Sequence, residues 1–306
     1  MQGSLSYTVI ASGITLTKTI VSFRVPEQTL GTNLDKLAHI IHGDVVPQAT
    51  CHGSVGTSGE LGKGGPLSVC TMPYLPGKSY LEVKSAYGDL SPVELEKQMA
   101  FNKHLARYFG RAWLNPQHVE PSQLEQQKGF VLEKLHVLED HPGFGFLKPH
   151  IRELRSESGL ATLYSPQTRQ VINHMDLSQT NILSRAKIGP FGLDFKFLRL
   201  LNGNANHLGW TDFKDRKALL QCFWDEFWTV TGVSDEAERE DIRRIAVLGA
   251  KLDTILGYSF CCTLGGETLD EVSAHPASYL RYWLTPLSWD ELVLGRLKKY
   301  QVFYYA

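Results

Sequence analysis

Near Pro76 the spacing of apolar residues changes, and this change limits the folds that the chain can adopt. Before it, β-branched and aromatic residues dominate two runs, 5–11 and 16–25, with Ser12-Gly13 between them. That pattern is typical of a β-hairpin. After Pro76, apolar residues recur at the spacing of amphipathic helices. The sequence therefore predicts an α+β protein in which a small β-rich part, residues 1–75, precedes a larger helical part, residues 76–306.

Local signals divide both parts into elements. In the first part we expect a helix over 34–42 and a strand pair over 49–55 and 67–72. In the second part, Ser91-Pro92-Val93-Glu94 combines a Ser cap, a first-turn Pro and a Glu three residues after the cap, which predicts the start of a helix. Ser122 with Glu125 predicts the next start by the same logic. Later helices are expected over 213–230 and 235–259, and from Ser288.

Charge and composition exclude several classes of protein. Lys and Arg number 31 and Asp and Glu 32, for a net charge of −1, whereas a dedicated nucleic-acid binder needs a basic face. The best candidate for a membrane span, residues 254–266, has only 13 uncharged residues, too few to cross a bilayer. Five cysteines without regular spacing predict reduced thiols. We therefore expect a cytoplasmic protein that binds neither nucleic acid nor a membrane.

One motif carries specific chemistry. Residues 171–183 read Val-Ile-Asn-His-Met-Asp-Leu-Ser-Gln-Thr-Asn-Ile-Leu, in which His174, Asp176 and Asn181 have the spacing of a kinase catalytic loop. Phosphoryl transfer needs a carboxylate to accept the proton of the attacking hydroxyl and an amide oxygen to bind a magnesium ion on the phosphates. The motif predicts Asp176 as the base, Asn181 as a magnesium ligand and His174 as a brace within a loop over 172–183.

With this motif as its most specific part, the chain resembles the fungal branch of the aminoglycoside phosphotransferase family, relatives of choline kinase. The resemblance covers roughly residues 3–260. It implies a protein-kinase-like two-lobe fold, with a small β-rich N-lobe and a larger helical C-lobe. It also implies transfer of the γ-phosphate of ATP, with Mg²⁺, to a hydroxyl of a small molecule. Six further stretches support it: Ser-Leu-Ser-Tyr-Thr-Val at 4–9, Ile-Val-Ser-Phe-Arg at 20–24, His-Gly-Asp-Val-Val-Pro at 42–47, Tyr-x-x-Gly-Lys-Ser-Tyr at 74–80, Gly-Pro-Phe-Gly-Leu at 189–193 and Phe-Trp-Asp-Glu-Phe-Trp at 223–228.

The resemblance also implies where the nucleotide would bind. Arg24 stands where a lysine normally contacts the phosphates, with Asp35 as a loose candidate for its partner on the helix. An arginine presents a planar fork of donors to phosphate where a lysine presents a compact charge. The segment Cys70-Thr71-Met72 would supply hinge backbone to an adenine ring. Gly3 and Ser4 would begin a shortened phosphate loop over residues 3–6.

The chain departs from the family pattern after Leu183. Relatives continue with a hairpin and then Val-Asp-Trp, whose aspartate is the principal metal ligand. Here residues 184–191 resemble the segment beyond that aspartate, so in this alignment the ligand is absent. In a competing alignment Asp194, thirteen residues after Asn181, takes its place, although Pro190 and two glycines predict a poor buried strand.

Three interpretations therefore stay open. The chain can be an active kinase that uses Asp194, a catalytically impaired pseudokinase or kinase-like binding module, or a sequence with a missed exon boundary after Leu183. A divalent ion held by one neutral amide would be bound weakly, because hard cations prefer anionic oxygens. If the metal aspartate is absent, we expect weak binding of ATP and magnesium.

Overall fold

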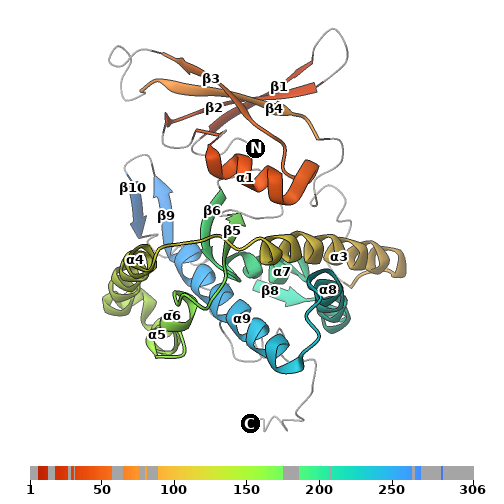
Figure 1. Ribbon diagram of the computed structural model, residues 1–306, viewed down its shortest axis with the longest axis vertical. Helices are drawn as coiled ribbons and strands as arrows, with labels where there is room; N and C mark the ends of the chain where they lie inside the picture. The colour runs from red at the N-terminus through yellow and green to blue at the C-terminus, as the bar shows by residue number, and fades with distance from the viewer. Residues whose placement is uncertain are drawn as a thin grey trace.

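The computed structural model describes residues 6–12, 18–26, 29–30, 32–56, 65–75, 80, 89–174, 186–206, 209–263, 266–269 and 284. They form a mixed α+β fold, with a four-stranded antiparallel sheet at one end of the molecule and most of the helices at the other (Figure 1). The change of pattern near Pro76 coincides with this division, because the last strand of the sheet ends at Pro73.

The sheet has the strand order β1-β2-β4-β3. The predicted hairpin pairs β1 with β2, Ser6 lying opposite Arg24 and Ser12 opposite Lys18. Along β4 the residues alternate between half-buried and buried up to Met72, as expected for a strand with one face on a core. The strand pair predicted over 49–55 and 67–72 is confirmed, because β3 pairs with β4. The four strands are β1 (Ser6–Ser12), β2 (Lys18–Arg24), β3 (Thr50–Val55) and β4 (Leu67–Pro73).

Helix α1 (Asn33–His42) lies between the sheet and the helical part (Figure 1). Its start is fixed by a capping box, in which the Thr32 hydroxyl and the Asp35 carboxylate each accept a hydrogen bond from the other residue's main-chain N–H. Its end is Gly43, whose φ of 67° is costly for a residue with a side chain. The helix predicted over 34–42 is confirmed.

The helical part contains seven α-helices, two 3₁₀ turns and three two-stranded ladders within the described residues. The helices are α3 (Pro92–Leu114), α4 (Pro121–Asp140), α5 (Lys148–Arg155), α6 (Leu160–Leu163), α7 (Lys196–Leu201), α8 (Arg216–Thr231) and α9 (Glu236–Ser259). The turns are η3 (Pro142–Leu147) and η4 (Leu193–Phe195). The ladders pair β5 (Gln170–His174) with β6 (Ala186–Pro190), β7 (Gly203–Asn206) with β8 (Gly209–Asp212) and β9 (Phe260–Thr263) with β10 (Gly266–Leu269).

The predicted start of α3 is confirmed. The predicted start of α4 is wrong. Ser91 caps α3 and forms a capping box with Glu94. Helix α4 starts one residue before the predicted Ser122 cap, with Pro121 as its first residue. The Gln123 side chain accepts a hydrogen bond from the main-chain N–H of Glu120, so Glu120 and Gln123 take the positions that we had given to Ser122 and Glu125.

The segment 186–190 forms strand β6, although Pro190 and two glycines predict a poor buried strand. It pairs with β5 from Ala186 to Pro190, and Gly189 and Pro190 are buried. Pro190 is tolerated because it lies at the end of a two-stranded ladder, opposite Gln170, where a missing N–H interrupts no run of hydrogen bonds.

The main hydrophobic core belongs to the helical part. Phe195 of η4 packs at its centre, with its ring centroid 4.5 Å from that of Phe109 and 5.0 Å from that of Phe191. From residues 1–75, only Ala38 of α1 is a fully buried member of this core. The sheet has a small cluster of its own, formed by Leu30, Cys70 and Met72.

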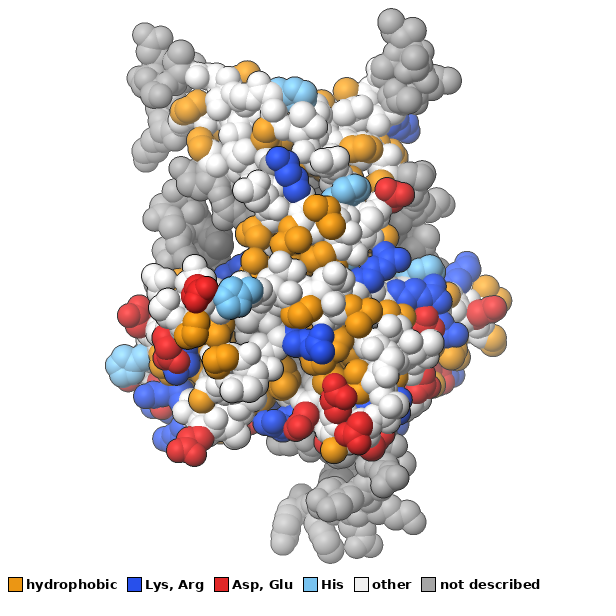
Figure 2. All heavy atoms as spheres, in the orientation of Figure 1, with side chains coloured by type: hydrophobic (Ala, Val, Ile, Leu, Met, Phe, Trp, Pro, Cys, Tyr) orange, Lys and Arg blue, Asp and Glu red, His pale blue; other side chains and the backbone are white. Residues whose placement is uncertain are grey.

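The cysteines depart from the expectation of reduced thiols. Cys51 of β3 and Cys70 of β4 are joined by a disulfide, while Cys222 is free and buried. The two residues lie directly opposite each other in the β3–β4 register, a proximity that their spacing in the sequence does not reveal. Among the described residues no helix is both long and apolar enough to span a bilayer. On the face in Figure 2, acidic and basic side chains are intermixed over the helical part.

Candidate functional site

A small cavity lies where the sheet and α1 meet the β5–β6 ladder. Its volume is about 40 Å³, and its walls are mainly apolar. Leu30 and Met72 come from the sheet's own cluster, Ala38 comes from α1, and Ile172 comes from β5. Its lining also includes the polar residues Asp35 of α1, Tyr108 of α3, and Asn173 and His174 of β5. The cavity therefore brings together segments that are far apart in the sequence.

Strand β5 holds His174 rigidly at this cavity. The strand is buried along its whole length. Asn173 donates from its side-chain amide to the carbonyls of Val171 and Gly189, each at 3.1 Å. The main-chain N–H of His174 donates to the carboxylate of Asp194, with an N–O distance of 2.5 Å. Since His174 is only 8% exposed, the chain enters the predicted catalytic loop from a fixed point.

Asp194 lies on η4, is bonded to the last residue of β5 and is 4% exposed. The turn packs tightly on α9: a side chain at Gly192, whose φ is 106°, would lie 2.7 Å from the Cα atom of Ala246. Burial raises the pKa of Asp194 well above its usual value, and the negative charge of Asp253 raises it further. The hydrogen bond from His174 and the charge of Lys196 act in the opposite direction. Asp194 is thus a buried group that holds the main chain of β5.

Tyr108 was not identified from the sequence, yet its ring forms part of the cavity wall. The ring stacks on His42 at the end of α1, with 3.8 Å between centroids. Burial raises the pKa of the Tyr108 hydroxyl, and the charge of Asp194 adds to the effect. The one signal in the sequence was its place beside Phe109 on a helix with an apolar face, which does not separate a cavity residue from a core residue.

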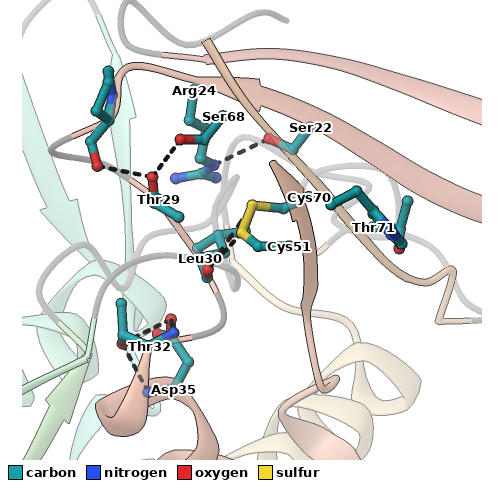
Figure 3. The surroundings of a disulfide bond; sticks show 12 residues. Ser22, Arg24, Thr29, Leu30, Thr32, Asp35, Cys51, Ser68, Cys70 and Thr71 are labelled. Carbon is teal, nitrogen blue, oxygen red and sulfur yellow. Dashed lines mark hydrogen bonds between the residues drawn. A yellow bond between two sulfur atoms is a disulfide. The ribbon is translucent and has the colours of Figure 1, made fainter. Parts of the chain in front are cut away.

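Met72 and Arg24 are the described residues that were predicted to contact the nucleotide. Met72 lines the cavity, and Arg24 does not. Met72 is buried on β4, opposite Ile20 of β2. Arg24, at the end of β2, donates from Nε to the Ser22 hydroxyl at 3.0 Å (Figure 3). The Asp35 carboxylate belongs to the cap of α1, where it accepts hydrogen bonds from the main chain and hydroxyl of Thr32. The suggested partnership of Arg24 and Asp35 stays a prediction.

The remaining predicted site residues are Gly3, Ser4, Asp176 and Asn181, and all four lie outside the described residues. The roles of Asp176 as the base and Asn181 as a magnesium ligand therefore stay predictions. Within the described part of the chain, no group of three His, Cys, Asp or Glu side chains could hold a metal ion. Asp194 remains a candidate metal ligand from sequence alone, with its carboxylate bonded to His174.

Comparison of the whole chain with models of known protein families, and with characterised proteins, finds no match.

Proposed function

We propose that the chain is an aminoglycoside phosphotransferase-like kinase that transfers the γ-phosphate of ATP to a hydroxyl of a small molecule. In this proposal residues 1–75 are the N-lobe and residues 76–306 the C-lobe of a protein-kinase-like fold. The supporting observation is that Met72 and His174 line one cavity, together with the first turn of α1. The family resemblance assigns these positions to the hinge, to the catalytic loop and to the helix of the small lobe.

The proposed chemistry depends on Asp176, two residues after His174 in the sequence. As phosphorus transfers, the bond from the γ-phosphorus to the bridging oxygen breaks and a bond to the acceptor hydroxyl oxygen forms, while Asp176 takes the hydroxyl proton. A base acts efficiently only when it is held in position. Strand β5 supplies a suitable support, because it is buried and its last main-chain N–H is bound by Asp194.

The described residues do not fit a magnesium site of the usual kind. Mg²⁺ prefers ionised carboxylate oxygens. Asp194 already accepts a main-chain hydrogen bond, and its raised pKa favours the neutral acid. We therefore derive no step through the metal.

A second candidate function is a catalytically impaired pseudokinase or kinase-like binding module. The size of the cavity favours it, since about 40 Å³ is far below the roughly 300–1,000 Å³ of sites for drug-sized ligands. In this arrangement the walls enclose too little space for an adenine ring. A binding module that recognises a small apolar group needs no magnesium and no base.

Calorimetric titration with ATP, with and without Mg²⁺, separates the two candidates. The kinase proposal expects binding that strengthens with Mg²⁺ and slow ATP turnover that is lost in Asp176→Ala. The binding module expects binding that is weak or absent, insensitive to Mg²⁺ and unchanged in Asp176→Ala.

Asp194→Asn is the matched control for the role of Asp194, because its amide oxygen can still accept the hydrogen bond from His174. If Asp194 only supports β5, Asp194→Asn should retain the response to Mg²⁺. Loss of that response in a folded Asp194→Asn protein would instead identify Asp194 as the metal ligand. Turnover that survives Asp176→Ala would contradict the assignment of the base.

A further inference from the structure

The disulfide between Cys51 and Cys70 joins the edge strand of the sheet to its neighbour (Figure 3). The two residues pair directly across the antiparallel ladder, with 4.2 Å between their Cα atoms. The register shifts immediately afterwards, between Cys51 and Ser54, and pairing resumes at Ser54 opposite Ser68. The disulfide thus adds a covalent link to the sheet next to an irregularity in β3.

The two cysteines differ in their exposure to solvent. Cys51 is exposed, as are the other residues of β3. Cys70 has no exposed surface and is buried with Leu30 and Met72. Thiol–disulfide exchange begins with attack of an external thiolate on an accessible sulfur. Cys51 is therefore the sulfur that an external thiol can reach, and Cys70 is the leaving group.

The disulfide also contacts a wall of the candidate site. Cys51 Sγ lies 2.9 Å from the carbonyl oxygen of Leu30, and Cys70 Sγ lies 3.8 Å from it. The side chain of Leu30 lines the cavity together with Met72 and Asp35. Leu30 is also two residues before Thr32, the cap of α1. A displacement at Leu30 would therefore change both the cavity and the start of α1.

Reduction requires a displacement next to Leu30. Two sulfur atoms that are no longer bonded must separate to non-bonded distance, and Cys70 is enclosed by close-packed neighbours that leave it little freedom to move. The exposed Cys51 side chain has the room to move, so reduction changes the position of its sulfur relative to the Leu30 carbonyl. Leu30 therefore has different sulfur neighbours in the oxidised and reduced proteins.

We propose that Cys51 and Cys70 form a reversible thiol–disulfide switch that controls the wall of the cavity and the start of α1. A thiolate of an external dithiol attacks Cys51 Sγ, the Cys51–Cys70 bond breaks, and Cys70 leaves as a thiolate that takes up a proton. The second thiolate of the reductant then attacks the mixed disulfide and releases Cys51, which is protonated in turn. Two electrons and two protons pass to the protein, and the dithiol becomes a disulfide. This proposal is independent of whether the chain is a kinase.

The test combines a redox titration with amide hydrogen exchange. The native protein is equilibrated with dithiothreitol in its reduced and oxidised forms at several ratios, and the Cys51–Cys70 linked peptide is quantified by mass spectrometry. The linked peptide should disappear and return as the ratio is cycled. In the same samples, exchange of the amides of α1 should become about tenfold faster on reduction, while that of α8 should stay constant.

Two variants make the result specific. Cys51→Ala removes the exposed partner without emptying the core, so its α1 should exchange as in the reduced protein at every ratio. Cys222→Ala removes a buried cysteine of α8 whose thiol donates to the Met99 carbonyl, and it should keep the full redox response. The proposal is overturned if the linked peptide is absent at all ratios or resists the dithiol in the native protein. It is also overturned if α1 exchange is the same in both states.

Discussion

His42 is a buried histidine that the fold keeps uncharged. It is 1% exposed, and within the described structure neither of its ring nitrogens has a hydrogen-bond partner. The guanidinium of Arg111 donates to the main-chain carbonyl of His42 at 2.8 Å. Burial lowers the pKa of His42 to about 3, and the nearby charges of Arg111 and His174 contribute to the shift. The contact between α1 and α3 therefore depends on a neutral ring stacked on Tyr108.

This shift predicts a loss of stability in acid. The folded pKa of about 3 lies below the ordinary value of 6.5, so the unfolded chain takes up a proton first as the pH falls below 6.5. The stability due to neutral His42 is complete above pH 6.5 and declines towards pH 3, by up to about 1.4 kcal/mol per pH unit. Urea unfolding at pH 7.5, 5.5 and 4.5 measures the decline.

His42→Phe keeps an aromatic ring on Tyr108 and removes the titration, so its stability should fall less steeply over this range. The raised pKa of Asp194 acts in the opposite direction in both proteins, so the difference between them isolates His42. His104→Phe, at an exposed position of α3, should behave as the wild type does. Equal slopes for the wild type and His42→Phe would show that His42 does not titrate in the unfolding reaction.

Among the elements, the contact between α3 and α8 depends on a glycine. Gly110 is buried near the C-terminal end of α3, and a Cβ atom there would lie 2.7 Å from Cγ1 of Val230 in α8. Alanine normally favours a helix over glycine, but this close approach reverses the expected sign. Gly110→Ala should lower the free energy of unfolding by about 1–3 kcal/mol, as overpacked core sites do.

Gly129 of α4 is the matched control, because nothing lies within 4 Å of the position that its Cβ would occupy. Gly129→Ala should raise the free energy of unfolding by up to about 1 kcal/mol. The double variant Gly110→Ala with Val230→Ala should recover part of the loss, since it removes the colliding methyl group. A Gly110→Ala protein as stable as the wild type would mean that α3 and α8 can move apart at no cost.

The longer elements could be predicted from local signals, and the errors have local causes. The capping box at Ser91 and Glu94 is a property of neighbouring residues and was visible in the sequence. The start of α4 was misplaced because Glu120 and Gln123 resemble Ser122 and Glu125 closely enough to compete. Strand β6 was doubted because propensity counts Pro190 against any strand, whereas its cost depends on its place in the ladder.

The candidate site could be predicted only in part, since it depends on contacts between distant segments. Met72 and His174 were each identified from the sequence, and the cavity that unites them follows from the packing of the sheet on β5. The bond from His174 to Asp194 spans twenty residues, and the sequence offered Asp194 only as a metal ligand. The pairing of Cys51 with Cys70 depends on the register of β3 and β4.

For the molecule as a whole, the distribution of buried residues predicts that the four-stranded sheet unfolds at lower urea concentration than the helical part. The main core lies almost wholly after residue 90, and the sheet's own fully buried cluster consists of Leu30, Cys70 and Met72. All six tryptophans also lie beyond residue 112, so tryptophan fluorescence reports on the helical part alone. Regions with few buried apolar contacts open at lower free energy than the global core does.

Pulse proteolysis at increasing urea, in non-reducing buffer, tests this order of opening. The first cleavages should fall within residues 1–75 at urea concentrations where tryptophan fluorescence is still native. Met72→Ala should move only this first transition to lower urea, because it removes a large part of the small cluster. Phe223→Ala should move only the fluorescence transition, because Phe223 is buried in the main core. If both variants moved both transitions together, the sheet and the helical part would unfold as a single cooperative unit, and the small cluster would draw its stability from the main core through α1.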